Sequence, residues 1–337
     1  MPSTSPSDLL APVYDAALRA DMAAGLALLD ALPAHGLTPA QQGVASALRA
    51  RFGANPPDVD EDLPSATAAI LRAYRAYWRR AMLAPASRSA AEGALLADLA
   101  PILAEQGAPP VDLDAATDAA KSAIEAEGLH ALTGVTLPLY ELMVWRSSVR
   151  TTYRVALPDR HVDVGVVFLD GFVSLGWAAY ATCERSHTGG WATATELYAV
   201  KSAYDVDSEQ FRVSYLAHEG QHFADYAAFP KLAQPELEYR AKLAEVALAD
   251  VTTHDLVARF AARTGEDRAI PHAFANAFVI RGLARAVLGR EPAPDGTDDW
   301  RRVPRERLNG AARDLLAGST RDLHARGAAT VERWLGE

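Results

Sequence analysis

The chain has 337 residues, half of them hydrophobic, which is enough for a core that shields a reactive site. Its formal charge of −10, without a cluster of Lys and Arg, argues against a nucleic-acid partner, because phosphate binding needs clustered positive charge. The single cysteine, Cys183, excludes an intrachain disulfide and a thiolate-rich metal site.

The N-terminal segment lacks the pattern of a secretory signal. It has no Lys or Arg before Arg19, and Asp15 and Asp21 interrupt its apolar residues. No uncharged apolar run in the sequence approaches the roughly 18 to 20 residues that a membrane helix needs. We therefore expect a cytoplasmic protein without a membrane partner.

Two regions of different composition follow one another. Residues 1–133 are rich in Ala and Leu at helical spacing, broken by Pro and Gly, which predicts an α-helical N-terminal region of five or six helices. Residues 134–337 are expected to form a second, α+β domain. Between residues 149 and 204 this domain is rich in Val, Thr, Tyr and Phe, with alternation around a Pro158–Asp159 turn. That pattern indicates a small antiparallel sheet of three to five strands.

The rest of the chain predicts helices. The segment from Asp205 to Phe229 has the pattern of one long helix, with Gln210 three residues after Asp207 as in a capping box. The next helix begins at Pro235, a residue that suits the first helical turn. Further helices are expected near residues 254–263, 271–289, 304–316 and 319–335.

The long helix carries the motif H-E-x-x-H in the residues His218, Glu219 and His222. Histidines four residues apart share one face of a helix, so both imidazoles can reach a single metal ion. Glu219 is offset too far to be a comfortable ligand, yet it can take a proton from a water held on the metal. Asp225, three residues after His222, could orient a ligand histidine. The alternative is a helix with two ordinary, partly buried histidines.

The third ligand is expected on the following helix, in "ELEYRAKLAE". Glu238 there makes the sequence resemble the gluzincin branch of H-E-x-x-H zinc metallopeptidases, whose third ligand is a Glu in an E-x-x-A/S-D/N setting. The residues Glu238 to Ala241 match the first part of that pattern, but Lys242 replaces its acidic or amide residue. Glu245 could orient a ligand or be the third ligand itself. Glu238 and Lys242 could also form an ordinary surface ion pair.

The resemblance covers roughly residues 149–250 and implies a zincin-like α+β fold. Such a fold has a small, mostly antiparallel sheet, an active-site helix and a helical C-terminal lobe, here preceded by the helical N-terminal region. It also implies an edge strand that pairs with an extended peptide, for which "GGWATATELYAV" is the candidate. The alternative for this segment is an internal strand that starts after a Gly-Gly turn. His272, His254 and Tyr239 are candidates for stabilising an oxyanion, although a capping or core role is the favoured interpretation of each.

The sequence thus predicts a zinc-dependent metallopeptidase that hydrolyses peptide bonds through a zinc-bound water activated by Glu219. The resemblance implies one Zn²⁺ per chain, held by His218, His222 and Glu238, and a peptide or protein substrate. The alternative function is a non-catalytic, metal-stabilised scaffold that binds another protein or peptide. Glu219 favours the enzyme, because a structural zinc site needs no base beside it and usually has a fourth protein ligand.

Overall fold

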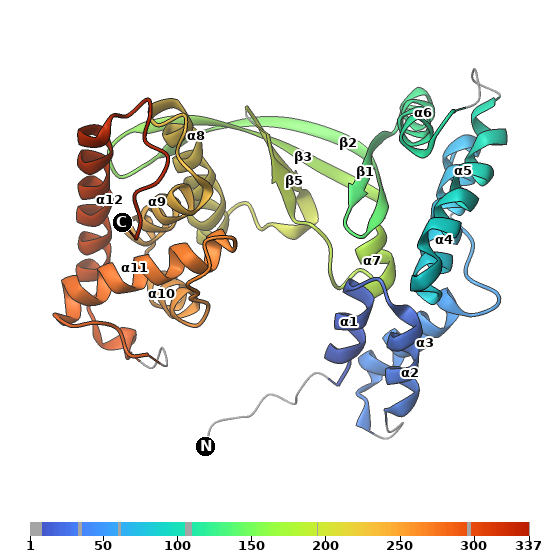
Figure 1. The fold of residues 1–337 in the computed structure, drawn as a ribbon, viewed down its shortest axis with the longest axis horizontal. Helices are drawn as coiled ribbons and strands as arrows, with labels where there is room; N and C mark the ends of the chain where they lie inside the picture. Colours follow the sequence, from blue (N-terminus) through green and yellow to red (C-terminus); the bar gives the residue numbers. More distant parts are fainter. Residues whose placement is uncertain are drawn as a thin grey trace. The chain divides into compact units, whose positions relative to one another are not determined.

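The structure, a computed structural model, describes residues 9–32, 36–59, 62–104, 110–193, 195–294 and 298–336. The fold is α+β, as the sequence predicts (Figure 1). The chain forms two compact units, the first from Met1–Val149 with Leu169–Gly189 and the second from Arg150–Phe168 with Gly190–Glu337. A division of the functional domains after residue 133 stays a prediction. No helix within the described ranges has both the length and the apolar character needed to cross a membrane.

The helices of the first unit agree with the expected helical N-terminal region. Asp112 caps the helix that directly precedes the sheet, because its side chain accepts a hydrogen bond from Ala115 N at 2.8 Å. The helices are α1 (Ala11–Leu18), α2 (Met22–Ala31), α3 (Pro39–Phe52), α4 (Ser65–Leu83), α5 (Arg88–Ala104), α6 (Leu113–Ala126) and, after strand β3, α7 (Trp177–Thr182).

Aromatic residues of α4 form the centre of the first unit's core. Tyr74, Tyr77 and Trp78 are at most 1% exposed. Their polar atoms also tie α4 to the sheet, since Tyr77 Oη accepts from Tyr140 N at 3.1 Å and Trp78 Nε1 donates to Tyr140 O at 2.9 Å. A buried aromatic side chain with a bonded polar atom contributes both apolar area and a fixed orientation.

The sheet begins earlier than expected, at His130 rather than near residue 149. The turn around Pro158–Asp159 joins two long strands, as predicted. The segment "GGWATATELYAV" forms two short antiparallel strands, of which β4 is last in the strand order. The strands are β1 (His130–Thr136), β2 (Leu139–Ala156), β3 (His161–Leu175), β4 (Gly190–Ala192) and β5 (Leu197–Val200), in the order β1-β2-β3-β5-β4.

Helices make up most of the second unit, and one boundary prediction was wrong. The expected helices 304–316 and 319–335 are a single helix that ends at Arg326. The hydroxyls of Ser319 and Thr320 donate to Leu316 O, so these helix-disfavouring residues are satisfied inside the helix. The helices are α8 (His218–Ala228), α9 (Gln234–Leu248), α10 (Thr253–Ala261), α11 (Pro271–Leu288) and α12 (Arg305–Arg326).

The expected long helix consists of two different parts. Phe211–Ala217 is a π-helix, and α8 continues from it at His218. Ser208 Oγ, instead of the expected Asp207 capping box, accepts from Phe211 N at 3.1 Å. Gly220 lets α8 approach the sheet closely, because a Cβ at this position would lie 3.1 Å from Val162 Cγ2. The motif helix is thereby packed directly on the strands.

In the first unit, the buried carboxyl group of Glu141 accepts a hydrogen bond from the first residue of helix α7. Glu141 is 6% exposed, and its Oε1 accepts hydrogen bonds from Leu142 N at 3.0 Å and Trp177 N at 2.9 Å. Burial raises the pKa of Glu141 to about 7, although these backbone hydrogen bonds act to lower it. Gly176 has φ 93°, and a Cβ there would lie 2.3 Å from Glu141 Oε1, so both backbone and space require glycine.

Replacing Glu141 should change how stability depends on pH. Because folding raises the pKa of Glu141, its protonated carboxyl group stabilises the folded state fully below about pH 4.5. This contribution to the free energy of unfolding falls as pH rises through 7. Glu141→Gln keeps an acceptor oxygen but cannot ionise. Its stability relative to the wild type should therefore increase by up to about 1.4 kcal/mol per pH unit across this window. Urea unfolding between pH 5 and 8 measures the difference. Parallel curves for the two proteins, as expected for the exposed control Glu125→Gln, would contradict the assignment.

Candidate metal centre

His218 and His222 stand one turn apart on α8 and direct ring nitrogens at each other. Their Nε2 atoms are 3.1 Å apart, and both residues are 8% exposed. The adjoining π-helical segment ends where the motif begins. A π-helix widens the turn and is frequent at functional sites, since it redirects the side chains that follow.

Glu238 on α9 completes a group of three buried ligand atoms. Its Oε1 lies 3.5 Å from His222 Nε2, and its Oε2 lies 3.6 Å from His218 Nε2. Ligand atoms about 2.0–2.1 Å from a tetrahedral ion are about 3.3 Å from one another. The two imidazole Nε2 atoms are 3.1 Å apart, each has a different Glu238 oxygen at 3.5 or 3.6 Å, and one ligand atom from each of the three residues lies within 4.8 Å of the others. The buried group His218, His222 and Glu238 could therefore hold a metal ion.

Glu245 orients His218 from the side away from the group. Its Oε1 lies 2.7 Å from His218 Nδ1. A carboxylate at Nδ1 favours the tautomer with the proton there, which leaves the Nε2 lone pair for a metal. Burial alone would lower the pKa of His218, but the Glu245 hydrogen bond and the nearby carboxylates raise it above its ordinary value. Of the two positions left open by the sequence, the structure thus places Glu238 with the histidines and Glu245 behind one of them.

Glu238 is anionic in this setting. Burial acts to raise the pKa of its carboxyl group, but the close imidazoles of His222, His272 and His218 hold that pKa far below its ordinary value. Lys242 Nζ lies 3.8 Å from Glu238 Oε2 and 4.8 Å from the Phe260 ring centroid. The pair expected on the surface therefore forms, but in the interior, where Glu238 is 5% and Lys242 6% exposed.

The three candidates for oxyanion stabilisation have different surroundings. His272 lies in the first turn of α11, with Nδ1 2.7 Å from Glu238 Oε2 and a side chain that is 70% exposed. His254 Nε2 contacts Val303 O at 3.0 Å, and Tyr239 packs against Trp334. Only His272 of these three lines the pocket beside the metal group.

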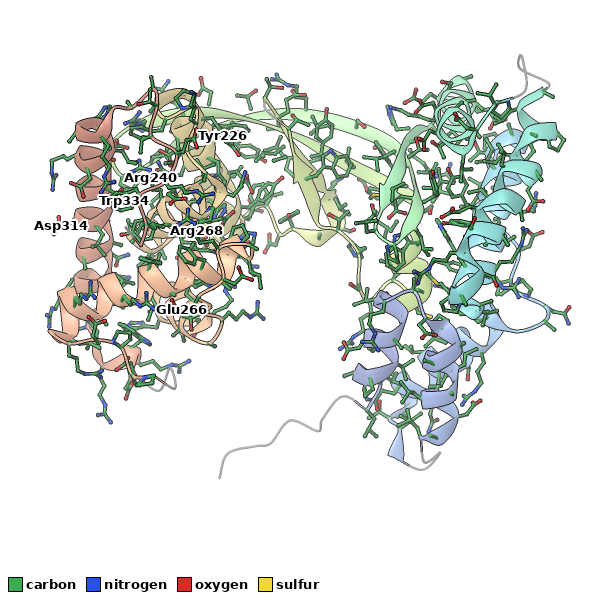
Figure 2. All side chains as sticks on the ribbon, viewed as in Figure 1. Tyr226, Arg240, Glu266, Arg268, Asp314 and Trp334 are labelled. Carbon is green, nitrogen blue, oxygen red and sulfur yellow. The ribbon has the colours of Figure 1, made fainter. Side chains whose placement is uncertain are left out.

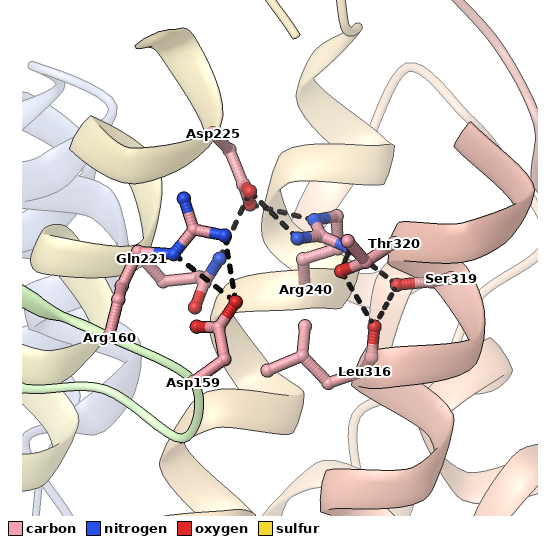
Figure 3. A network of polar contacts seen from close by, with 8 residues as sticks. All are labelled: Asp159, Arg160, Gln221, Asp225, Arg240, Leu316, Ser319 and Thr320. Carbon is pink, nitrogen blue, oxygen red and sulfur yellow. Dashed lines mark hydrogen bonds and ion pairs between the residues drawn. The ribbon is translucent and has the colours of Figure 1, made fainter. Parts of the chain in front are cut away.

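Asp225 does not orient a histidine, contrary to the sequence-based expectation. It accepts two hydrogen bonds from Arg240, from Nε and Nη2 at 2.9 Å each, and one from Gln221 Nε2 at 3.0 Å (Figure 3). The carboxylate is turned toward α9 because a buried guanidinium offers it two parallel donors. His222 Nδ1 is buried and has no hydrogen-bond partner among the described residues.

The same network extends to a third helix. Arg240 Nη1 donates to Ser319 Oγ at 2.5 Å and to Thr320 Oγ1 at 3.1 Å, both on α12 (Figure 3). Asp225 and Arg240 are 1% and 2% exposed. Since Asp225 follows His222 by three residues and Arg240 follows Glu238 by two, this ion pair fixes the spacing of the two ligand-bearing helices.

A second buried charge holds the start of α9. Glu236 is fully buried, and its Oε1 and Oε2 accept hydrogen bonds from Arg268 Nη2 at 2.7 and 2.8 Å. Its Oε1 also accepts from Trp334 N at 3.1 Å. Arg268 and Trp334 are labelled beside this helix in Figure 2. The helix that carries Glu238 is thus fixed on both sides of the ligand.

A pocket of about 540 Å³ lies against the metal group. Glu219 is half-buried and lines it together with His218, Glu245 and His272. No hydrogen bond or ion pair engages the Glu219 carboxylate within the described part of the chain. Burial is the main cause of the raised pKa of Tyr204 and of Tyr215, and the nearby charge of Glu219 raises both further. The site therefore combines three convergent metal-binding groups, a free carboxylate and space for a ligand.

Comparison with known proteins gives no relative from which a role could be transferred. Neither the protein-family models nor the curated proteins nor the solved structures include a match to this chain. The functional assignment therefore depends on the geometry of the site.

Metal binding should depend on ligands and on Glu245 to different degrees. His222→Ala removes a ligand and should abolish stoichiometric metal binding. Glu245→Gln keeps the shape but not the charge behind His218, and should weaken affinity about 10- to 100-fold. Metal analysis and competition with a chelator measure both effects. The exposed control Glu266→Gln should bind as the wild type does, and a Glu245→Gln affinity equal to that of this control would contradict the role of Glu245.

Breaking the Asp225–Arg240 pair should destabilise the second unit and weaken the metal site together. Arg240→Met leaves a buried carboxylate without its cation, which should cost about 3–5 kcal/mol of unfolding free energy. Arg240→Met combined with Asp225→Asn should recover part of that loss. Arg321→Met, an exposed position on α12, is the control. Denaturant unfolding of the metal-free protein measures the stability, and metal titration measures the affinity. Full metal affinity in the Arg240→Met variant would contradict a link between the ion pair and the metal site.

Proposed function

We propose that the protein is a zinc-dependent peptidase in which His218, His222 and Glu238 bind one Zn²⁺. Two imidazoles and a carboxylate are a donor set used by catalytic zinc sites, which keep a coordination position open. Several metals bind imidazole, and we choose zinc because of the carboxylate of Glu219. Hydrolysis at zinc uses a base of this kind and involves no change of oxidation state.

The observation that carries the proposal is the position of Glu219. It follows the ligand His218 directly, lines the same pocket and has no partner in the described residues that would occupy its oxygens. Other charged groups around the ligands are engaged, Glu245 with His218 and Lys242 with Glu238. Glu219 is therefore the group available to move a proton.

The residues supply a balanced hydrolysis of an amide bond. When bound, zinc supplies Lewis acidity, which polarises a substrate carbonyl and makes water a stronger acid near neutral pH. Glu219 accepts one proton from the water whose oxygen bonds to the carbonyl carbon. It then delivers that proton to the amide nitrogen as the carbon–nitrogen bond breaks, so a carboxylic acid and an amine are released. Glu245 keeps His218 in its orientation through Nδ1 meanwhile.

Removing the base should separate catalysis from metal binding. Glu219→Gln should retain one zinc per chain and lose hydrolysis of a mixed peptide library by about 100- to 10,000-fold, the usual contribution of a positioned acid–base group. Mass spectrometry of the peptides and metal analysis of the same sample give both readouts. The exposed control Glu332→Gln should remain active. Unchanged hydrolysis in Glu219→Gln would remove Glu219 from the mechanism, and a zinc-loaded wild type without hydrolysis would favour the non-catalytic scaffold.

A further inference from the structure

Two arginines line the same pocket as Glu219. Arg259 belongs to α10 and Arg263 follows that helix, four residues later, and both are exposed. They share the lining of the pocket with the apolar side chains of Phe260, Ile270 and Ala273. A pocket of about 540 Å³ is in the range that accommodates a small ligand or a few side chains.

These arginines have no acidic partner among the described residues, although carboxylates stand near them in the sequence. Asp255, one helical turn before Arg259, pairs with Arg301 at 2.9 Å. Glu266, labelled in Figure 2, pairs with Arg281. In a chain of net charge −10, two arginines that remain unpaired beside a pocket are available to an outside anion.

The charge of the pocket also favours an anion once a metal is present. The pocket and the metal group contain three carboxylates, Glu219, Glu238 and Glu245, and three cations, Lys242, Arg259 and Arg263. A divalent ion gives this set an excess of positive charge. A guanidinium binds a carboxylate through two parallel N–H donors, which fixes the orientation of the bound group as well as its charge.

We propose that Arg259 and Arg263 bind a substrate carboxylate next to the scissile amide, so that the enzyme prefers acidic peptides. The role of the bound carboxylate as part of a substrate rests on the proposed peptidase function, but the binding preference can be measured without turnover. The carboxylate can come from an Asp or Glu side chain or from the C-terminus of a peptide. The two sources share the same chemistry and differ in which peptides bind.

The test is calorimetric binding to the zinc-loaded, full-length Glu219→Gln protein and to the wild type. The probes are three hexapeptides with blocked ends and a central Asp-Glu, Asn-Gln or Lys-Lys pair, and the Asn-Gln peptide with a free C-terminal carboxylate. We expect a carboxylate-bearing peptide to bind at least about tenfold more tightly than the blocked Asn-Gln peptide, with a preference that weakens as salt rises. Tighter binding of the central Asp-Glu peptide identifies the side chain as the source, and tighter binding of the free C-terminus identifies the chain end.

Arginine variants then locate the preference. Arg259→Gln with Arg263→Gln should remove it, and Arg259→Glu with Arg263→Glu should invert it in favour of the Lys-Lys peptide. Arg321→Gln removes one exposed arginine of α12 outside the pocket and should leave it unchanged. Equal affinity for all four peptides, no binding of any of them, or a preference that survives the double Gln variant would overturn the inference. Absence of hydrolysis by the wild type alongside a preserved binding preference would instead overturn the proposed peptidase function.

Discussion

A buried ion pair between Asp225 and Arg240 is the constraint on which the geometry of the site depends. Each partner loses its hydration inside the second unit, so the pair adds little net stability but is costly to break. Helices α8 and α9 therefore have one favourable register. In that register His222 and Glu238, which lie two or three residues from the pair, face each other. The convergence of the ligands follows from a salt bridge that does not itself touch the metal group.

Helix α9 shows how much charge can be buried when every charged group has a partner. Glu236 is held by Arg268, Glu238 by the histidines and Lys242, and Glu245 by His218. An unpaired charge in this environment would cost several kcal/mol, so partners on neighbouring helices are required. This requirement also explains why α9 has no polar face. Its polar residues point inward in different directions, toward α8, α11 and α12.

Local patterns in the sequence were sufficient for some of these features and not for others. The spacing of His218 and His222 fixes their common face, and the Pro158–Asp159 turn fixes a hairpin, because both depend on residues close in the chain. The partner of Asp225 and the interior position of Lys242 depend on contacts between helices that periodicity does not encode. The continuous helix α12 was missed because Gly318, Ser319 and Thr320 in succession resemble a helix break. The bonds of the two hydroxyls to Leu316 O and Arg240 are contacts that the local pattern does not reveal.

All five residues of the motif have a distinct environment, and this distribution gives Glu219 its meaning. His218 and His222 face Glu238, Gly220 contacts the sheet, and Gln221 donates to Asp225. Four of the five positions thereby belong to the candidate metal group or to the packing of α8. Glu219 faces the pocket without a partner in the described chain, although a half-buried carboxylate gains stability from a donor. A carboxylate kept free of structural bonds beside the candidate metal group is available for proton transfer, and this supports the proposed hydrolysis over the alternative of metal-dependent folding alone.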